Sequence, residues 1–364
     1  MMPEVAPLQQ SAQSILVIQL GDIGDVVLSI PAFRTVRENF PRAKVTVAVR
    51  AKANELIRQI PWVDGAVAVN EDRRSPLGEL RHQREFFSFV RRHRFDLAID
   101  LRTGTRGAIL AWLSGAKERV GFLDLEAAWR NRLFTRLYRL EYRLPQHVSA
   151  YYAGLLRAHG LTVSEAAPEM RVPSETMERA SEILRSAGVP ADRPVIAIQP
   201  FSLWRYKEWG IDKFALLVQR ILEACPASIA ITGSPDERSR AEDIARRCGP
   251  DGRRVHNLAG KTSLGELSAL IAACRLFIGP DSAGVHIAAA VGTPTLAIFG
   301  PSAPASWAPA GENHAVVQKN LSCVPCRRKG CDGSGISRCL EELDVDEVWT
   351  VVQTQMNRLG IDAP

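Results

Sequence analysis

The stretch QLGDIGDVVLSIPAFRTVRENFP (19–41) leads from an apolar segment into an amphipathic one through a turn with two Gly-Asp pairs. Residues SILVIQL (14–20) are mostly apolar, which is typical of a buried strand. Apolar residues recur at helical spacing over 26–39, which predicts a helix. The turn therefore places two carboxylates, Asp22 and Asp25, between the end of a strand and the start of a helix.

The same strand-then-helix pattern continues through almost the whole chain. Further strands are predicted at 44–50, 65–69, 96–101, 194–200, 228–233, 276–281 and 295–300. Helices are predicted at 55–60, in the basic segment before 96, and at 211–224, 236–247, 282–290 and 344–358. Strands that alternate with helices indicate parallel sheets with right-handed crossovers. We expect an α/β protein of two Rossmann-like domains with parallel sheets that face a central cleft.

A polar, proline-containing stretch at 161–173 interrupts the pattern and is interpreted as the linker between the domains. The expected organisation is a disordered tail at 1–13, an N-terminal domain at 14–165, a C-terminal domain at 174–343 with a cysteine-rich loop at 321–340, and a C-terminal helix at 344–364. The prediction allows this helix to pack on either domain, so the chain could cross back to the N-terminal domain.

Charge is distributed unevenly along the 364 residues. The net charge is +6, and residues 1–170 carry 24 Lys and Arg against 18 Asp and Glu, so the later residues balance at zero. A basic face attracts an anionic partner such as a phosphorylated glycolipid, a nucleic acid or a membrane surface. The alternative is a solvated arginine-rich helix surface.

The chain start gives no sign of a secretory signal, because MMPEVAPLQQSAQS lacks a basic beginning and an apolar centre. No apolar run approaches the roughly 20 residues of a membrane span. We expect a cytoplasmic protein, with peripheral association at the inner face of the cytoplasmic membrane as a further option.

The first turn differs from a dinucleotide site in its charge. Such a site uses G-x-G-x-x-G with phosphate at the helix N-terminus, whereas G-D-I-G-D brings two carboxylates that repel phosphate. The first domain is therefore not expected to hold a nucleotide. A carboxylate here can also simply cap the helix, which is the favoured reading for Asp22 and the less favoured one for Asp25.

A second site is predicted in IGPDSAGVHIAAAVGTPTLAIFG (278–300), where a strand runs into a helix of small residues. Small side chains leave the first N–H groups of a helix open, which suits a diphosphate. The residues concerned are Asp281, Ser282, Ala283, Gly284 and His286. The alternative is a capped helix with a structural histidine.

Other loops follow strands of the same domain. QPFSLWRYKEWG (199–210) offers the hydroxyl of Ser202 and the cation of Lys207, which can pair with a phosphate or lie on the surface. TGSPDE (232–237) offers the carboxylate of Glu237 to ribose hydroxyls. NLAGKTSLGEL (257–267) offers backbone groups and apolar contacts to a base at Leu258, Ala259 and Gly260.

Taken in order, these motifs resemble glycosyltransferase family 9, the heptosyltransferases of lipopolysaccharide inner-core assembly and their relatives. The resemblance runs from about residue 14 to the C-terminal helix and rests on L-G-D-I-G-D-V-V-L-S-I-P-A, the W-x-Y-K-x-W loop, N-L-A-G-K-T-S-L and G-P-D-S-A-G-V-H-I-A-A-A. It implies the GT-B fold, an acceptor-binding first domain and a donor-binding second domain. It also implies ADP-L-glycero-D-manno-heptose as donor and transfer with inversion, without a catalytic metal.

The resemblance also assigns roles to residues. Asp25 matches the general base, and Lys207 with the helix after Asp281 would stabilise the diphosphate leaving group. Donor-site positions are matched by Ser202, Glu237, Asp281, Ser282, Gly284 and His286. Phe201 stands where the family often has glycine, so the resemblance does not extend to this position of the phosphate loop. Separately from the resemblance, the candidate acceptor-side residues are Asp22, Arg102, Arg106, Arg119 and Arg130, and the sequence does not identify the acceptor.

Four of the seven cysteines lie within 17 residues with the spacing C-x2-C-x4-C-x7-C. Such a spacing favours a structural zinc or iron site formed by Cys323, Cys326, Cys331 and Cys339. The resemblance supports it, since iron-binding clusters occur in relatives. Free thiols are the alternative. Cys225, Cys248 and Cys274 are expected to be ordinary core or surface thiols.

The expected function is an inverting glycosyltransferase that uses an ADP-sugar and an anionic glycolipid or other glycan acceptor, with no nucleic-acid partner. A nucleotide-sugar epimerase of similar fold is an alternative, but no convincing additional acid/base residues are found. A zinc-containing nucleic-acid-binding protein is an alternative of another class, and the absence of basic-aromatic interleaving near the cysteines argues against it.

Overall fold

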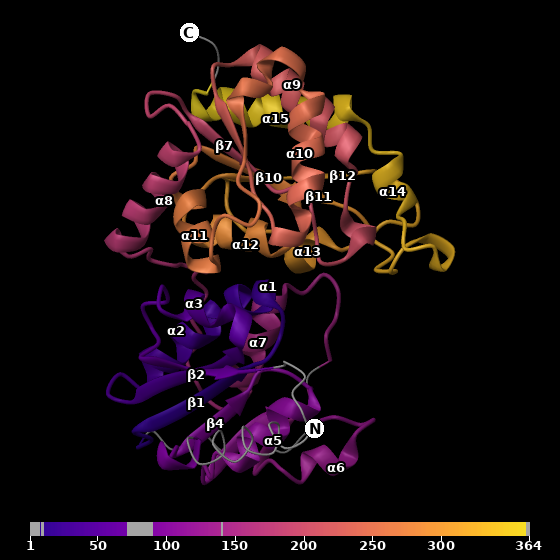
Figure 1. Ribbon diagram of the computed structural model, residues 1–364. Helices are drawn as coiled ribbons and strands as arrows, with labels where there is room; N and C mark the ends of the chain where they lie inside the picture. The colour runs from indigo at the N-terminus through magenta and orange to yellow at the C-terminus, as the bar shows by residue number, and fades with distance from the viewer. Residues whose placement is uncertain (1–7, 9–10, 71–89, 140, 362–364) are drawn as a thin grey trace, which may run out of the picture. The chain divides into compact units, whose positions relative to one another are not determined.

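The computed structural model describes residues 8, 11–70, 90–139 and 141–361 (Figure 1). The chain divides into two compact units, Met1–Met170 and Arg171–Pro364. Within the described ranges no helix is both long and apolar enough to cross a membrane. The basic helix expected before residue 96 lies largely outside the described residues.

Unit 1 is a six-stranded sheet with helices on its faces. The strand order is β3-β2-β1-β4-β5-β6, and every neighbouring pair is parallel. The strands are β1 (Ser14–Gln19), β2 (Lys44–Arg50), β3 (Gly65–Val69), β4 (Leu97–Asp100), β5 (Glu118–Phe122) and β6 (Arg136–Tyr138). The helices are α1 (Ile23–Leu28), α2 (Ile30–Asn39), α3 (Asn54–Ile57), α5 (Thr105–Leu113), α6 (Ala128–Asn131) and α7 (Val148–Ala158), with a 3-10 turn η1 (Ala51–Ala53).

Unit 2 repeats this topology. Its strand order is β12-β11-β10-β7-β8-β9, again parallel throughout. The strands are β7 (Val195–Ile198), β8 (Ser228–Ile231), β9 (Val255–Asn257), β10 (Leu276–Pro280), β11 (Thr295–Phe299) and β12 (His314–Gln318). The helices are α8 (Ser174–Ser186), α9 (Ile211–Ala224), α10 (Arg238–Arg247), α11 (Leu264–Ala272), α12 (Ala283–Ala290), α13 (Pro304–Trp307), α14 (Arg338–Glu341) and α15 (Val345–Leu359). The 3-10 turns are η2 (Arg205–Lys207), η3 (Pro235–Glu237), η4 (Gly249–Arg254) and η5 (Cys331–Gly333).

Both sheets therefore have the doubly wound Rossmann order, which confirms the predicted α/β class and the two Rossmann-like sheets. The central strands β4, β7, β8, β10 and β11 are buried along their whole length, as their apolar runs predicted, and β1 is fully buried from Ile15 to Gln19. In such sheets ligands bind beyond the carboxyl ends of the strands, where the strand order reverses. That point lies between β1 and β4 in unit 1 and between β7 and β10 in unit 2.

The helix predicted at 26–39 is in fact two helices. α1 ends at Leu28, and α2 begins at Ile30 with Pro31 in its first turn. Proline has no N–H and cannot donate to the carbonyl four residues earlier, so a continuous helix is interrupted here. Strands β5, β6, β9 and β12 were not predicted, because short strands with half-exposed residues lack a continuous apolar run.

Leu8 and α15 both pack against other parts of their own units. Leu8 is buried and its N–H donates to the carbonyl of His159 at 3.2 Å, so it does not fit the predicted disordered tail. At the other end, α15 runs beside α9 in unit 2 (Figure 1). Its residues Val348, Val352 and Met356 belong to the apolar core of that unit.

Candidate functional site

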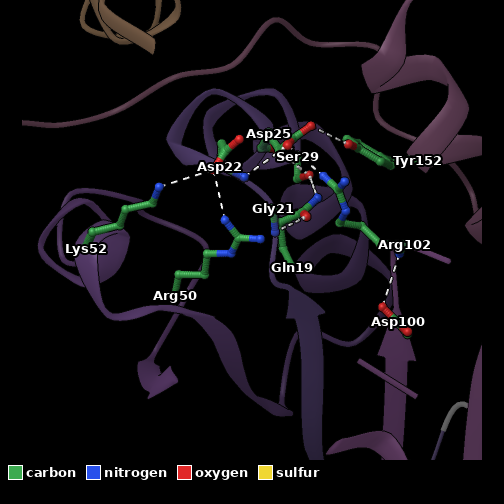
Figure 2. Close-up of polar contacts among 10 residues, drawn as sticks. All are labelled: Gln19, Gly21, Asp22, Asp25, Ser29, Arg50, Lys52, Asp100, Arg102 and Tyr152. Carbon is green, nitrogen blue, oxygen red and sulfur yellow. Dashed lines mark hydrogen bonds and ion pairs between the residues drawn. The ribbon is translucent and has the colours of Figure 1, made fainter. Parts of the chain in front are cut away.

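Asp25 lies where the strand order of unit 1 reverses, and its carboxylate accepts hydrogen bonds from three donors (Figure 2). Its Oδ2 accepts from Arg102 Nη1 at 2.6 Å and from the Asp22 N–H at 3.0 Å. Its Oδ1 accepts from the Tyr152 hydroxyl at 2.9 Å. The side chain is 15% exposed, so Asp25 is a largely buried carboxylate held in one orientation.

The loop between β1 and α1 is shaped for this contact. Gly21 donates its N–H to Gln19 Oε1 at 3.1 Å, and Gln19 Nε2 donates to Ser29 Oγ at 2.5 Å. A Cβ on Gly21 would overlap Arg102 Nη1 and the Asp25 side chain. Glycine is therefore required here because the backbone passes directly beneath the ion pair.

Asp22 is the N-cap residue of α1, and Asp25 three residues later accepts its N–H, so both carboxylates contribute to the start of the helix. Its carboxylate also pairs with two cations from β2 and η1, because Oδ1 accepts from Arg50 Nη1 at 2.9 Å and from Lys52 Nζ at 3.1 Å (Figure 2). Neither cation was predicted. Together with Arg102 they place three cations around two carboxylates at the end of the sheet.

Arg102 is held by a buried pair beneath it. Its backbone N–H donates to Asp100 Oδ1 at 3.1 Å, and its carbonyl accepts from Arg130 Nη2 at 2.9 Å. Asp100 and Arg130 are both fully buried and lie 3.4 Å apart. Burial raises the pKa of Asp100 to about 7, although Arg130 opposes that shift.

Two of the acceptor-side cations suggested by the sequence are corrected. Arg130 is fully buried and donates to the carbonyls of Phe122 and Arg102, so it stabilises the loop instead of facing a ligand. Arg119 likewise donates to the carbonyls of Leu133 and Ala116. Guanidinium groups satisfy several backbone acceptors at once, which accounts for these roles. Arg106 is exposed in the first turn of α5.

The surroundings shift the pKa of two groups next to Asp25. Burial, followed by the Asp25 charge, raises the pKa of the Tyr152 hydroxyl well above its usual range. The pKa of Arg102 is also raised: burial acts against its charge, but Asp25 and other neighbours outweigh it. Tyr152 thus remains a hydroxyl donor and Arg102 a cation. Sequence reasoning did not identify Tyr152, because no motif includes it. Its only local feature is that it lies on the buried side of α7.

Lys207 and Asp281 form the corresponding pair in unit 2. Lys207 Nζ donates to Asp281 Oδ2 at 2.6 Å, and Asp281 Oδ1 lies 3.8 Å from His286 Nε2. Asp281 follows β10 and is 3% exposed, while Lys207 comes from the turn after β7. The fold therefore brings together three of the predicted donor-site residues where the strand order reverses.

Three unsatisfied polar atoms belong to residues that follow β7, β8 and β10, at the carboxyl edge of the unit 2 sheet. Gln199 Oε1, Thr232 Oγ1 and Ser282 Oγ are buried and have no hydrogen-bond partner among the described residues. Ser282 is the N-cap of α12, and a Cβ on Gly284 would overlap Gln199 Oε1 and the Phe277 ring. Buried polar atoms normally find partners, so these three are available to a ligand. Ala283 is the first residue of the helix.

The loops after β7 and β8 are held by a second ion pair, which the sequence did not indicate. Ser202 donates its N–H to Glu208 Oε1 at 3.2 Å, and Glu208 also pairs with Arg240. The Arg240 guanidinium lies 4.5 Å from the centre of the buried Phe201 ring. Phe201, which stands where the resemblance leads us to expect glycine, is thus accommodated in the core.

Glu237 and the loop after β9 also lie at this edge of the sheet. Glu237 Oε2 accepts from the Ser234 N–H at 2.7 Å, so its carboxylate is engaged in a helix cap. Leu258 and Ala259 are buried, whereas Gly260 has a left-handed φ of 73° and donates to the Gly233 carbonyl at 2.9 Å. These loops are contiguous with the Lys207 site because β7, β8 and β9 are neighbours.

The predicted four-cysteine metal site is not supported. The described residues contain no group of three or more His, Cys, Asp or Glu side chains placed to hold a metal ion. Cys323 is exposed, whereas Cys339 belongs to the apolar core of unit 2. Burial, together with the nearby Cys326 and Cys331, raises the pKa of the Cys339 thiol to about 11.

The remaining cysteines agree with the sequence. Cys225, Cys248 and Cys274 are buried free thiols, as expected of core residues.

Comparison with known proteins places the chain in a family. The model of "Glycosyltransferase family 9 (heptosyltransferase)" matches residues 83–336, which is more than half of the chain. Lipopolysaccharide heptosyltransferase 3 of Escherichia coli (strain K12) is 27% identical over 348 residues, covering 94% of this chain and 96% of that protein.

Solved structures share the fold. A family 9 glycosyltransferase from Veillonella parvula DSM 2008 superimposes with a TM-score of 0.82 at 20% identity, covering 97% of this chain and 99% of that one. The ADP-heptose lipopolysaccharide heptosyltransferase II of E. coli gives 0.78 at 23% identity, covering 95% and 99%. Together with the family match, these similarities show that the chain belongs to glycosyltransferase family 9.

Proposed function

We propose that this protein is an inverting heptosyltransferase that moves heptose from ADP-heptose to a hydroxyl of a lipopolysaccharide-core saccharide or a related glycan. The family match and the names of the relatives support the reaction class. The observation that carries the residue assignment is a paired acid and cation at the strand reversal of each unit, Asp25 with Arg102 and Lys207 with Asp281.

The acceptor would bind at unit 1, with Asp25 as general base. The acceptor oxygen attacks the anomeric carbon while its proton passes to the Asp25 carboxylate. The bond from that carbon to the phosphate oxygen breaks, and ADP departs with the electron pair. Attack opposite the leaving group inverts the anomeric centre. A positioned base of this kind contributes roughly 100- to 10,000-fold to the rate.

The donor would bind at unit 2, where the polar atoms of Gln199, Thr232 and Ser282 remain available. Lys207 and the N-terminus of α12 would stabilise the negative charge that develops on the diphosphate. Asp281 holds Lys207 in place and offsets part of its charge. Lys207 therefore acts chiefly through its position, as a directed donor to the phosphate.

Arg102, Arg106, Arg50 and Lys52 are proposed to attract an anionic acceptor, in keeping with the basic excess of residues 1–170. Such an acceptor would be presented at the cytoplasmic face of the inner membrane, where the protein would associate peripherally.

The test combines a donor assay with one substitution. Purified protein is incubated with ADP-heptose and a heptose-deficient core acceptor, and released ADP and the anomeric configuration of the product are measured. Asp25→Asn is expected to lower kcat at least ~100-fold with ADP affinity nearly unchanged. Glu38→Gln, in an exposed ion pair with Arg34 on α2, is the matched control.

Retention of configuration would contradict the inverting mechanism. Near-normal turnover of Asp25→Asn would remove Asp25 as the base. Conversion of the donor sugar without transfer would indicate the epimerase alternative.

A further inference from the structure

The two oxygens of the Asp25 carboxylate differ in how fully they are occupied. Oδ2 accepts from Arg102 Nη1 and from the Asp22 N–H. Oδ1 accepts only from the Tyr152 hydroxyl within the described part of the chain. Each carboxylate oxygen offers about two lone-pair sites, so Oδ2 is saturated while Oδ1 keeps one site open.

Tyr152 is well placed to control the open oxygen. It lies on α7, 127 residues from Asp25 in sequence, and is 4% exposed. The neighbouring Ser149 Oγ donates to the carbonyl of Leu28 at 2.7 Å, which ties α7 to the end of α1. The hydroxyl is therefore presented to Asp25 from a helix that is fixed against the same turn.

We propose that Tyr152 is a positioning residue that fixes the Asp25 carboxylate so that Oδ1 receives the acceptor proton. This inference rests on the proposed role of Asp25 as general base. The tyrosine keeps its own proton throughout, and the only proton transferred is that of the acceptor hydroxyl. Arg102 and the Asp22 N–H hold Oδ2, while Tyr152 blocks one lone-pair site of Oδ1 and leaves the other for the acceptor.

Two consequences distinguish this role from simple packing. Without the tyrosine hydroxyl the carboxylate can rotate, so turnover falls although donor binding does not. A carboxylate that has lost a donor is also protonated more easily, because hydrogen bonds to the charged form favour it. The acidic limb of the rate profile should therefore move to higher pH.

The experiment compares Tyr152→Phe with Tyr151→Phe in the full-length protein. Tyr151 is the matched control because its ring stacks on Phe122 with centroids 4.7 Å apart and lies next to Tyr152 in α7. For Tyr152→Phe we expect kcat to fall about 10-fold, the KM for ADP-heptose to stay unchanged, and the acidic limb of kcat/KM to move up by about one pH unit. Tyr151→Phe should match the wild-type protein in all three.

The melting temperature of each variant confirms that it folds. A Tyr152→Phe profile that superimposes on the wild type overturns the inference while leaving the base assignment intact, provided that Asp25→Asn is inactive. A fall in kcat without any pH shift also overturns it, since loss of packing alone would produce that result. An active Asp25→Asn variant refutes the base role and the inference with it.

Discussion

Gly21 controls how closely Arg102 and Asp25 approach the backbone of the β1–α1 turn. A Cβ there would overlap both side chains, and both belong to the proposed acceptor site. The Asp25–Arg102 ion pair therefore packs directly against the turn. The absence of a side chain at Gly21 allows Asp25 to take the position proposed for the base.

Gly21→Ala is expected to lower kcat at least ~10-fold, because a displacement of a base by about 1 Å is enough to reduce the rate strongly. Steady-state kinetics with saturating donor provide the measurement. Gly104→Ala is the control, since a Cβ at Gly104 meets nothing within 4 Å and its φ is negative. Equal activity of the two variants would show that the turn tolerates the displacement.

Asp100 makes a pH-dependent contribution to stability. Its pKa is raised from 3.8 to about 7 in the folded protein by burial, so the folded state retains a proton that the unfolded state has already lost. Stability from this group is therefore present below about pH 4 and is lost as the pH rises towards 7.

Asp100→Asn removes that titration, so the variant should gain stability relative to the wild-type protein as the pH rises from about 4 to about 7. Melting temperatures of both proteins across this range provide the measurement. Other groups titrate equally in the two proteins and cancel in the difference. A difference that stays constant with pH would contradict the raised pKa.

At the scale of elements, the small residues of α12 allow this helix to pack close to the sheet. Gly284 lies against Gln199 Oε1 and the Phe277 ring, so the helix starts close to the end of β7. The same approach keeps the Ser282 and Gln199 oxygens together at the helix N-terminus. A helix of bulkier residues would stand away from the sheet and separate these groups.

Gly284→Ala is expected to weaken ADP binding about 10-fold, because the added methyl group displaces Gln199 or the helix. Ala has the better helix propensity by roughly 1 kcal/mol, but overpacking costs roughly 1–3 kcal/mol, so the melting temperature should fall as well. Calorimetry with ADP and thermal unfolding are the measurements. Unchanged ADP affinity would place the donor away from this helix end.

At the scale of the whole molecule, charge is divided between the units. Residues 1–170 carry the full excess of +6, and the rest is balanced. An anionic acceptor bound at unit 1 would therefore be attracted over long range, while a donor bound at unit 2 depends on short contacts such as that of Lys207.

Raising the salt concentration in the assay from about 0.05 to about 0.5 M should increase the acceptor KM several-fold. Over this range the electrostatic screening length falls to a few Å. The donor KM should change less. Both constants are measured in one titration series with sodium chloride. An equal increase in both would show that the uneven charge does not act on the acceptor.

Local pattern determined much of this protein. Apolar runs followed by helical spacing predicted the buried central strands, and the residues directly after them, such as Asp25, Lys207 and Asp281, followed as site candidates. These features are readable because strand ends and helix starts depend on neighbouring residues. Because all strands of each sheet are parallel, the loops that follow them meet at the same edge.

Tertiary structure decided the partners. Arg102 and Tyr152 reach Asp25 from 77 and 127 residues away, and no local pattern specifies such contacts. The same limitation explains why Arg130 was mistaken for a surface cation and why four closely spaced cysteines were read as a metal site. Burial of Arg130 and Cys339 depends on what the rest of the chain packs around them, and that packing fixes which charges pair.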